Sequence, residues 1–261
     1  MTRLSPKATP RTAARAVRLV ETFVVESAGD RHVAQWGHAA QNRCAALALD
    51  EQALSRPELM DQVRVYIGRI VARLAAIDVQ AIRDAAPSPL FGLLEPTGER
   101  IDTPRKLGAV RAELADLIDL TRAALDPLLT LKGALDDHAR RVEEANLEIE
   151  AAALAALFLS EHLASAWPEL SRHFLRREMS LTETAMELRG GQFERTRQAE
   201  ESRALIAAIQ DVVLTTLPDW LARVAPLGRA ARRDLTPVEV DELQHRLRVI
   251  LRTLEAQDRP Q

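Results

Sequence analysis

The sequence predicts an all-α protein, an elongated bundle of long amphipathic helices with coiled-coil-like packing. Apolar residues make up 47% of the 261 residues, so a large core is possible and a disordered chain is excluded. Aromatic residues make up only 3%, while Ala, Leu, Arg and Glu dominate, as in helices whose apolar stripes pack on one another. The period-two alternation that indicates strands is nearly absent.

The first third of the chain predicts an arm followed by a helical hairpin. Residues 1–11 favour a flexible arm, and residues 12–86 form the predicted N-terminal helical hairpin region. Within it we expect helices over 12–26, 33–54 and 57–84. The last of these carries apolar residues at helical spacing, namely Val63, Ile67, Ile70, Leu74 and Ile77.

Proline and glycine crowd residues 87–104 and predict the one clear loop or linker of the chain. Its apolar stretch Pro89–Leu94 is expected to dock on a helix surface, with an exposed peptide-like recognition element as the alternative. Everything after the loop, residues 105–257, is predicted to be a long-helix, coiled-coil-like region. The loop would therefore separate a smaller N-terminal part from a longer C-terminal part.

A series of apolar or small residues with steps of three and four predicts one very long helix. The period of 3.5 keeps one seam facing a partner helix. We expect this seam to pack against later helices of the same chain, with self-association as the second possibility. Pro127 removes a backbone donor, so a kink or break is expected near Leu125 and Asp126. The seam consists of Leu107, Val110, Leu114, Leu117, Thr121, Ala124, Leu128, Leu131, Leu135, His138, Val142, Ala145, Ile149, Ala152, Ala156, Leu159 and Leu163.

The remaining residues predict three further helices. Pro168 begins a shorter helix that ends near the Gly190–Gly191 pair. A long return helix is expected over 192–224. The final helix begins at Thr236–Pro237, where Glu239 completes the pattern of a capping box.

Charge, cysteine usage and apolar run lengths favour a protein that stays in the cytoplasm, with contact to the inner membrane as an open possibility. The net charge is −3, so no global basic field holds the chain on nucleic acid. The single Cys44 excludes an internal disulfide and favours a buried thiol in a reducing compartment. The N-terminus lacks the apolar stretch of a secretory signal, and the longest apolar runs are shorter than a membrane span.

The sequence contains no recognisable catalytic, cofactor-binding or metal-binding pattern. None of the six histidines has the spacing of a helical zinc site, and no two helices carry the Glu-x-x-His pair of a di-metal bundle. Gly190–Gly191 lacks the remaining residues of a phosphate-binding loop. His138 lies on the seam, where we expect a hydrogen-bonded or register-setting core residue. We therefore expect no enzyme, no cofactor and no nucleic-acid partner.

One segment resembles a known family. Ile209–Trp220 contains Ile-Gln, then Thr-Thr-Leu-Pro and a Trp, and is similar to the most recognisable motif of the toxic anion (tellurite) resistance family. A weaker resemblance is Trp36–Gln41, followed by the Pro-Leu-Phe-Gly loop in the same order as in that family. The chain is shorter than typical members, and the family's Pro-Gln-Ile-Arg block is replaced by Phe193–Thr196. The motif positions, whose role is unknown, are Gln210, Thr215, Thr216, Pro218 and Trp220.

The motif also has a physical interpretation without the family. Pro218 frees a backbone carbonyl near Leu214, and the hydroxyls of Thr215 and Thr216 can bond freed or neighbouring carbonyls, so a bend is expected. Trp220 follows the bend and is expected to anchor it in the core, with a docking surface as the alternative.

The resemblance implies a non-enzymatic helical scaffold or adaptor in tellurite resistance or the envelope stress response, acting through protein contacts. The alternative is a peripheral membrane protein that uses a basic N-terminal face and a second basic cluster. The face consists of Arg3, Lys7, Arg11, Arg15 and Arg18, and the cluster of Arg229, Arg232 and Arg233. A protein that acts directly on the oxyanion is a third hypothesis, but reduction would need a cofactor or a thiol pair, and Cys44 stands alone.

Overall fold

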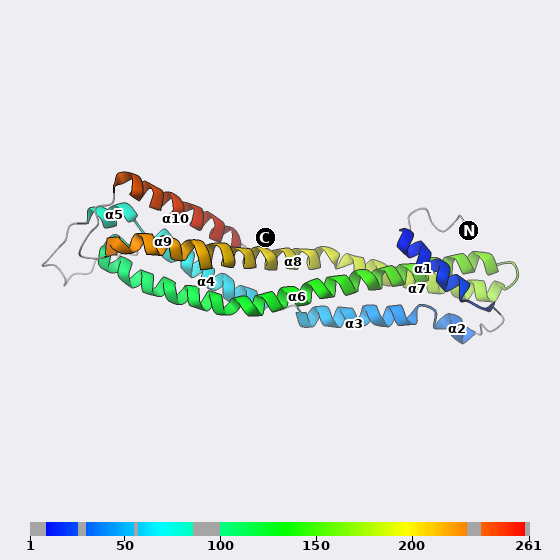
Figure 1. Cartoon of the computed structure of the whole chain (residues 1–261). Helices are drawn as coiled ribbons and strands as arrows, with labels where there is room; N and C mark the ends of the chain where they lie inside the picture. The colour runs from blue at the N-terminus through cyan, green and yellow to red at the C-terminus, as the bar shows by residue number, and fades with distance from the viewer. Residues whose placement is uncertain (1–8, 26–29, 55–56, 86–99, 229–235, 259–261) are drawn as a thin grey trace. The chain divides into compact units, whose positions relative to one another are not determined.

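The computed structural model of the chain describes residues 9–25, 30–54, 57–85, 100–228 and 236–258, and these are helical nearly throughout (Figure 1). The predicted all-α class is confirmed. Over the described ranges the only β-type pairing is an isolated parallel bridge between Ile77 and Ile101. The first eight residues, the Pro89–Leu94 stretch and the Arg229–Arg233 cluster lie outside the described residues.

The described residues form two compact units, and each unit is built from two separate parts of the chain. Unit 1 lies within Met1–Ser55 and Gly133–Ala199, and unit 2 within Arg56–Lys132 and Glu200–Gln261. This division differs from the predicted linear one, in which residues 12–86 form one hairpin region. The reason is that helices far apart in sequence bury their apolar faces on one another, so proximity in sequence does not define the cores.

The N-terminal helices are shorter than predicted. Helix α1 (Pro10–Glu21) begins two residues early, because the Thr9 hydroxyl caps it by accepting a hydrogen bond from the Thr12 backbone N–H at 3.2 Å. The expected arm therefore loses its last two residues to α1. The helix predicted over 33–54 is divided into α2 (Asp30–Ala34) and α3 (His38–Leu54).

Gly37 causes this division. Its φ is +70°, a left-handed conformation in which a side chain is strained. A Cβ at this position would lie only 2.6 Å from the side chain of Leu181 on helix α7 (Pro168–Gly190). The glycine therefore permits both the turn and the close approach of α7.

We predict that Gly37→Ala lowers the free energy of unfolding by about 1–3 kcal/mol, because it adds backbone strain and a steric clash. Urea unfolding followed by circular dichroism measures the change. Gly133→Ala in helix α6 (Pro104–Leu163) is the matched control, because a Cβ there meets nothing within 4 Å. It should instead stabilise the helix by about 0.5–1 kcal/mol. Equal effects of the two substitutions would contradict the assigned role of Gly37.

The helix predicted over 57–84 also ends early and is followed by a second one. Helix α4 (Pro57–Ala75) stops before Ile77, and α5 (Val79–Asp84) follows it. The Ile101 N–H donates to the Ala76 carbonyl at 2.8 Å, and the Asp78 N–H donates to the Ile101 carbonyl at 3.0 Å. These bonds use backbone groups that a continuous helix would need, and buried Ile77 and Ile101 pack in the core of unit 2.

Helix α6 (Pro104–Leu163) is a single helix of 60 residues, and the expected break near Pro127 does not occur. Pro127 leaves the Ala123 carbonyl without its usual donor. Both residues are exposed, so solvent can satisfy that carbonyl and the helix continues. Every position of the predicted seam is buried or half-buried, which confirms the seam as the core-facing stripe of α6.

The C-terminal helices closely follow the prediction. Helix α7 (Pro168–Gly190) is followed by α8 (Gln192–Ala208), a π-helix (Ile209–Thr216), α9 (Leu217–Val224) and a short 3₁₀ turn. Helix α10 (Pro237–Asp258) has the expected capping box. Thr236 Oγ1 accepts from the Glu239 N–H at 3.3 Å, and the Glu239 carboxylate accepts from the Thr236 N–H at 2.8 Å.

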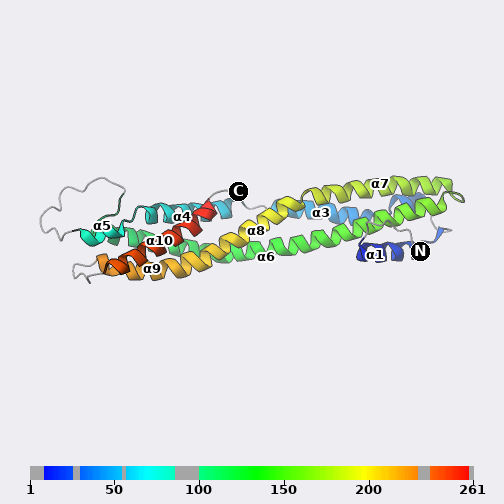
Figure 2. The same cartoon turned by 90° about the horizontal axis from the view of Figure 1, so that it is seen from above.

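Each unit has its own core. In unit 2, α10 lies against α4, α5, the π-helix and α9, and the first part of α6 completes one large aliphatic core (Figure 2). In unit 1, α2 and α3 contact α7, and the α6 residues in the core are mostly small. Three aromatic rings, Phe23, Trp36 and Phe174, meet edge to face there, with centroids 5.2–5.8 Å apart.

Candidate functional site

The family-like segment forms a π-helix rather than the expected bend. The hydroxyl of Thr215 donates to the Gln210 carbonyl at 2.8 Å, and that of Thr216 donates to the Asp211 carbonyl at 2.7 Å. Each bond reaches back five residues, which is the register of a π-helix. The expected hydroxyl-to-backbone bonds are thus present, and the adjustment of the helix takes the form of a wider turn.

The five motif positions do not converge on a cavity. Gln210, Thr215 and Thr216 are exposed, and Pro218 is half-buried. Trp220 is only 1% exposed, and its indole N–H donates to the Leu243 carbonyl of α10 at 2.9 Å. The predicted core anchoring of Trp220 is confirmed. The motif therefore joins α9 to α10 and presents a small polar surface at its threonines.

We predict that Trp220→Phe destabilises unit 2 by about 1–3 kcal/mol, because the smaller ring leaves part of the buried indole volume unfilled and the Leu243 carbonyl loses the second of its two donors. Thermal unfolding monitored by circular dichroism measures the loss. Trp167→Phe changes an exposed tryptophan of unit 1 and should leave the transition unchanged. A Trp220→Phe variant as stable as the wild type would show that the indole bond contributes nothing.

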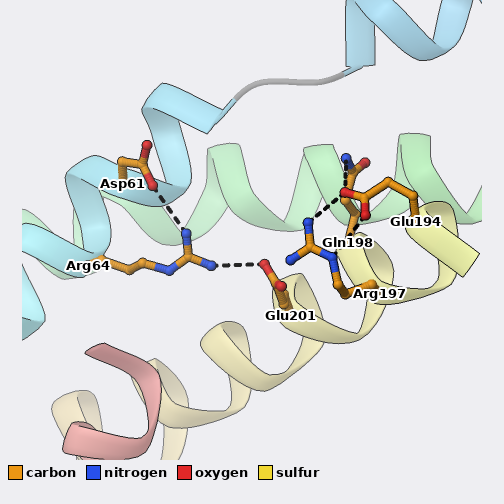
Figure 3. Close-up of polar contacts among 6 residues, drawn as sticks. All are labelled: Asp61, Arg64, Glu194, Arg197, Gln198 and Glu201. Atoms are coloured by element: carbon orange, nitrogen blue, oxygen red, sulfur yellow. Dashed lines mark hydrogen bonds and ion pairs between the residues drawn. The ribbon is translucent and has the colours of Figure 1, made fainter. Parts of the chain in front are cut away.

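An ion-pair clamp joins α4 to α8 within unit 2 (Figure 3). The Arg64 guanidinium lies 3.0 Å from the Glu201 carboxylate and 3.1 Å from that of Asp61 on its own helix. The side chains of Arg64 and Glu201 are each 23% exposed, so water screens this pair less than a surface pair. Nothing about this clamp requires a ligand, and it acts as a structural contact.

A second polar cluster, also in Figure 3, lies within α8 on the unit 1 side. The Glu194 carboxylate accepts hydrogen bonds from Arg197 at 2.6 and 3.0 Å and from Gln198 at 3.2 Å. The hydrogen bond from Arg197 holds the pKa of Glu194 below its ordinary value. Contacts three and four residues apart are typical of an exposed helix face.

The second family-like segment, Trp36–Gln41, surrounds the turn between α2 and α3. Arg177 of α7 donates from Nε to the Trp36 carbonyl at 3.0 Å and from a terminal nitrogen to the Gln41 side chain at 2.8 Å. The Gln41 amide donates in turn to Ser180 and Thr184, both at 3.1 Å. Burial lowers the pKa of the Arg177 guanidinium. The network satisfies backbone groups at the turn and leaves no free nucleophile or base.

His138 lies on the buried stripe of α6 in unit 1, but it is not hydrogen-bonded as expected. Its side chain is 2% exposed, and neither ring nitrogen has a partner among the described residues. Burial lowers the pKa of His138; Glu51 acts in the opposite direction, and Arg141 and Arg195 reinforce the effect of burial. The ring is therefore held neutral at neutral pH.

The lowered pKa of His138 predicts a loss of stability in acid. As pH falls through 6.5, the ordinary pKa of a histidine, His138 takes up a proton in the unfolded chain but not in the folded chain. The free energy of unfolding is therefore highest above that pH and decreases below it. Urea unfolding at pH 7.5 and 5.5 should show a smaller pH-dependent loss for His138→Leu than for the wild type. His245→Gln, at an exposed site, is the control and should behave as the wild type. If the wild type, His138→Leu and His245→Gln all lost the same free energy of unfolding between pH 7.5 and 5.5, the role assigned to His138 would be refuted.

The residues considered for chemistry show no reactive arrangement. Cys44 is buried as expected, and burial, reinforced by Glu148, raises the pKa of its thiol. Over the described ranges, no three His, Cys, Asp or Glu side chains lie close enough together to hold a metal ion. A groove of about 840 Å³ lies between α3 and α6. Its Arg141 pairs with Asp50 at 2.8 Å, so the positive charge there is compensated.

One helical stretch, Pro168–Leu227, is long and apolar enough to cross a membrane by length and composition only. Half of its most apolar part is buried inside the protein. Core helices pass the same test, so this observation by itself is weak evidence for a span.

The feature that sequence reasoning missed is an exposed apolar face on α7. Leu175, Met179 and Met186 are 46%, 64% and 67% exposed, and Phe193 at the start of α8 is 79% exposed. Spacings of four and seven residues place the three α7 side chains on one side of the helix. The pattern was visible in the sequence, but such spacing ordinarily indicates a core face, and only the structure shows that this one is uncovered by described residues.

Comparisons of the chain with protein-family models, curated proteins and solved structures find no match. The resemblance to the toxic anion resistance family therefore stays a prediction based on the residues quoted above.

Proposed function

We propose that this protein is a non-enzymatic helical scaffold that acts through protein contacts made by the exposed apolar face of α7. The observation that carries the proposal is the exposure of Leu175, Met179 and Met186 on one side of a well-packed helix. Adjacent large apolar side chains that stay in water typically mark an interaction site. Methionine side chains adapt to the shape of different partners, which suits a docking surface.

The cellular setting that we propose is resistance to toxic anions such as tellurite, or the response to envelope stress. Support comes from the resemblance of Ile209–Trp220 and Trp36–Gln41 to the toxic anion resistance family. Both segments lie in polar or buried networks that stabilise their units. In this proposal they maintain the scaffold, and the α7 face makes the contact.

A peripheral membrane role, the alternative, receives less support. The apolar side of α1 is used inside unit 1, where Ala16 is fully buried against Ala151 and Ala155. Arg15 pairs with Glu144 of α6, so the basic face is partly neutralised. Helices that bind membranes in the interface need a free apolar face beside free basic residues.

Affinity purification tests the scaffold proposal. The tagged wild type, expressed at its native level, should enrich a specific partner, and Met179→Glu with Met186→Glu should lower the enrichment about tenfold or more. Val65→Glu with Val249→Glu places the same charges at exposed apolar positions of unit 2 and is the matched control. In cells that lack the gene, tellurite tolerance should be restored by the wild type and the control but not by the α7 variant.

Two results would contradict the proposal. Equal enrichment of every partner by the wild type and the α7 variant would exclude this face as the contact. Full tolerance of all toxic anions tried after deletion of the gene would exclude the resistance setting.

A further inference from the structure

We propose that the partner of the α7 face is a second copy of this chain, bound antiparallel about a two-fold axis that passes beside Met179 and Ser180. The inference rests on the proposed function, because it names the occupant of the same face. Three features carry it: the geometry of the apolar stripe, the order of charges beside it and the symmetry of those charges about one point of the helix.

The apolar stripe of α7 is narrow and continuous. Successive helical residues rotate by about 100°, so Leu175, Met179 and Met186 fall within an arc of about 40°. Thr182, half-buried, lies at the edge of the same stripe. On the opposite side of the helix, buried Leu170, Phe174, Leu181 and Ala185 pack into unit 1. The helix therefore has two apolar sides, one used in the core and one open.

One flank of the stripe carries charges that change sign along the helix. Arg172 and Arg176 lie on the N-terminal half of this flank, and Glu183 and Glu187 lie on the C-terminal half. All four are exposed, and the structure gives Arg176, Glu183 and Glu187 no ion-pair partner among the described residues. Arg172 pairs only with Glu169 on its own helix. Because this ion pair is exposed and weak, Arg172 can leave Glu169 for a glutamate of a second copy at little cost in free energy.

The charges are arranged symmetrically about the centre of the stripe. Arg176 precedes Met179 by three residues and Glu183 follows Ser180 by three; Arg172 precedes Met179 by seven and Glu187 follows Ser180 by seven. A two-fold axis at that point brings each arginine of one copy level with a glutamate of the other. The axis keeps the same flank of both helices on the same side, so all four pairs form together.

The apolar residues fit the same register. Met179 lies next to the axis and contacts Met179 of the second copy, and Leu175 reaches the level between Thr182 and Met186 of the second copy. In a parallel two-fold dimer this flank of one copy would lie beside the opposite flank of the other, so the four arginine–glutamate pairs could not form. The antiparallel arrangement also opposes the two helix dipoles. Both charge terms therefore favour the antiparallel dimer.

The same charges disfavour a lipid surface as the occupant. The flank carries two arginines and two glutamates, so it has no net positive charge that would attract anionic headgroups. One helix face buries less area than a standard stable interface, so we expect a dissociation constant on the order of micromolar. Experiments need protein at tens of micromolar.

Sedimentation equilibrium of the full chain tests the dimer. The wild type should be a reversible dimer, and Met179→Glu with Met186→Glu should weaken it about tenfold or more. An acidic variant (Arg172→Glu, Arg176→Glu) and a basic variant (Glu183→Arg, Glu187→Arg) should each be monomeric alone and should dimerise when mixed. The variant with all four charges reversed should dimerise as the wild type does, and circular dichroism confirms that each variant is folded.

Crosslinking tests the position of the axis. With the native thiol removed by Cys44→Ala, Met179→Cys should form a disulfide-linked dimer under mild oxidation, because the two copies of this position meet. Met186→Cys is the control and should not crosslink to itself, since its two copies lie about 20 Å apart along the paired helices at 1.5 Å per residue.

Three outcomes would overturn the dimer. These are a wild type that stays monomeric at 100 µM, a dimer that withstands Met179→Glu with Met186→Glu, or acidic and basic variants that each dimerise as the wild type does. A monomeric wild type that still captures another protein, with loss of capture in the α7 variant, would refute this inference and leave the scaffold function standing. A wild type that neither dimerises nor captures another protein would refute the dimer and the scaffold function together.

Discussion

The structure depends on the apolar stripe of α6, because this one helix supplies core residues to both units. The stripe changes character along the helix. In unit 2 it consists of large side chains such as Leu107, Leu114 and Leu128, which bury enough area to form an aliphatic core with α4 and α10. In unit 1 it consists largely of alanines such as Ala145, Ala152 and Ala156, which bury little area but let helices approach closely.

Unit 1 therefore needs other contacts to order its helices. The Phe23, Trp36 and Phe174 rings concentrate apolar area at the turn between α2 and α3, and Arg177 satisfies the backbone carbonyl exposed by that turn. Gly37 is required because both the turn and Leu181 leave no room for a side chain. Because the core of unit 1 consists of small residues, the stability of this unit depends on a few specific polar and steric contacts.

The structure separates the residues that hold the fold from those available to partners. Trp220 and the π-helix use their polar groups on the chain itself, and Arg141 in the groove between α3 and α6 already pairs with Asp50. The stripe of α7 is different, because its apolar side chains are exposed and three of its flanking charges, on Arg176, Glu183 and Glu187, have no ion-pair partner among the described residues. The candidate site for partners is therefore the exposed surface of α7 and not a cavity.

The sequence by itself determined the helical class, the core-facing stripe of α6, the capping box at Thr236 and the order of most helices. These follow from local periodicity and from groups close together in the chain. Only the tertiary structure decided where helices break, because Gly37 and Ile77 respond to Leu181 and Ile101, which are distant in sequence. It also decided that the helix continues through Pro127, since Pro127 and Ala123 are exposed and solvent can satisfy the freed carbonyl. The structure likewise decided that the His138 ring has no hydrogen-bond partner among the described residues. Whether an apolar stripe is covered depends on its neighbours in space, so the open face of α7 could be recognised only in the folded chain.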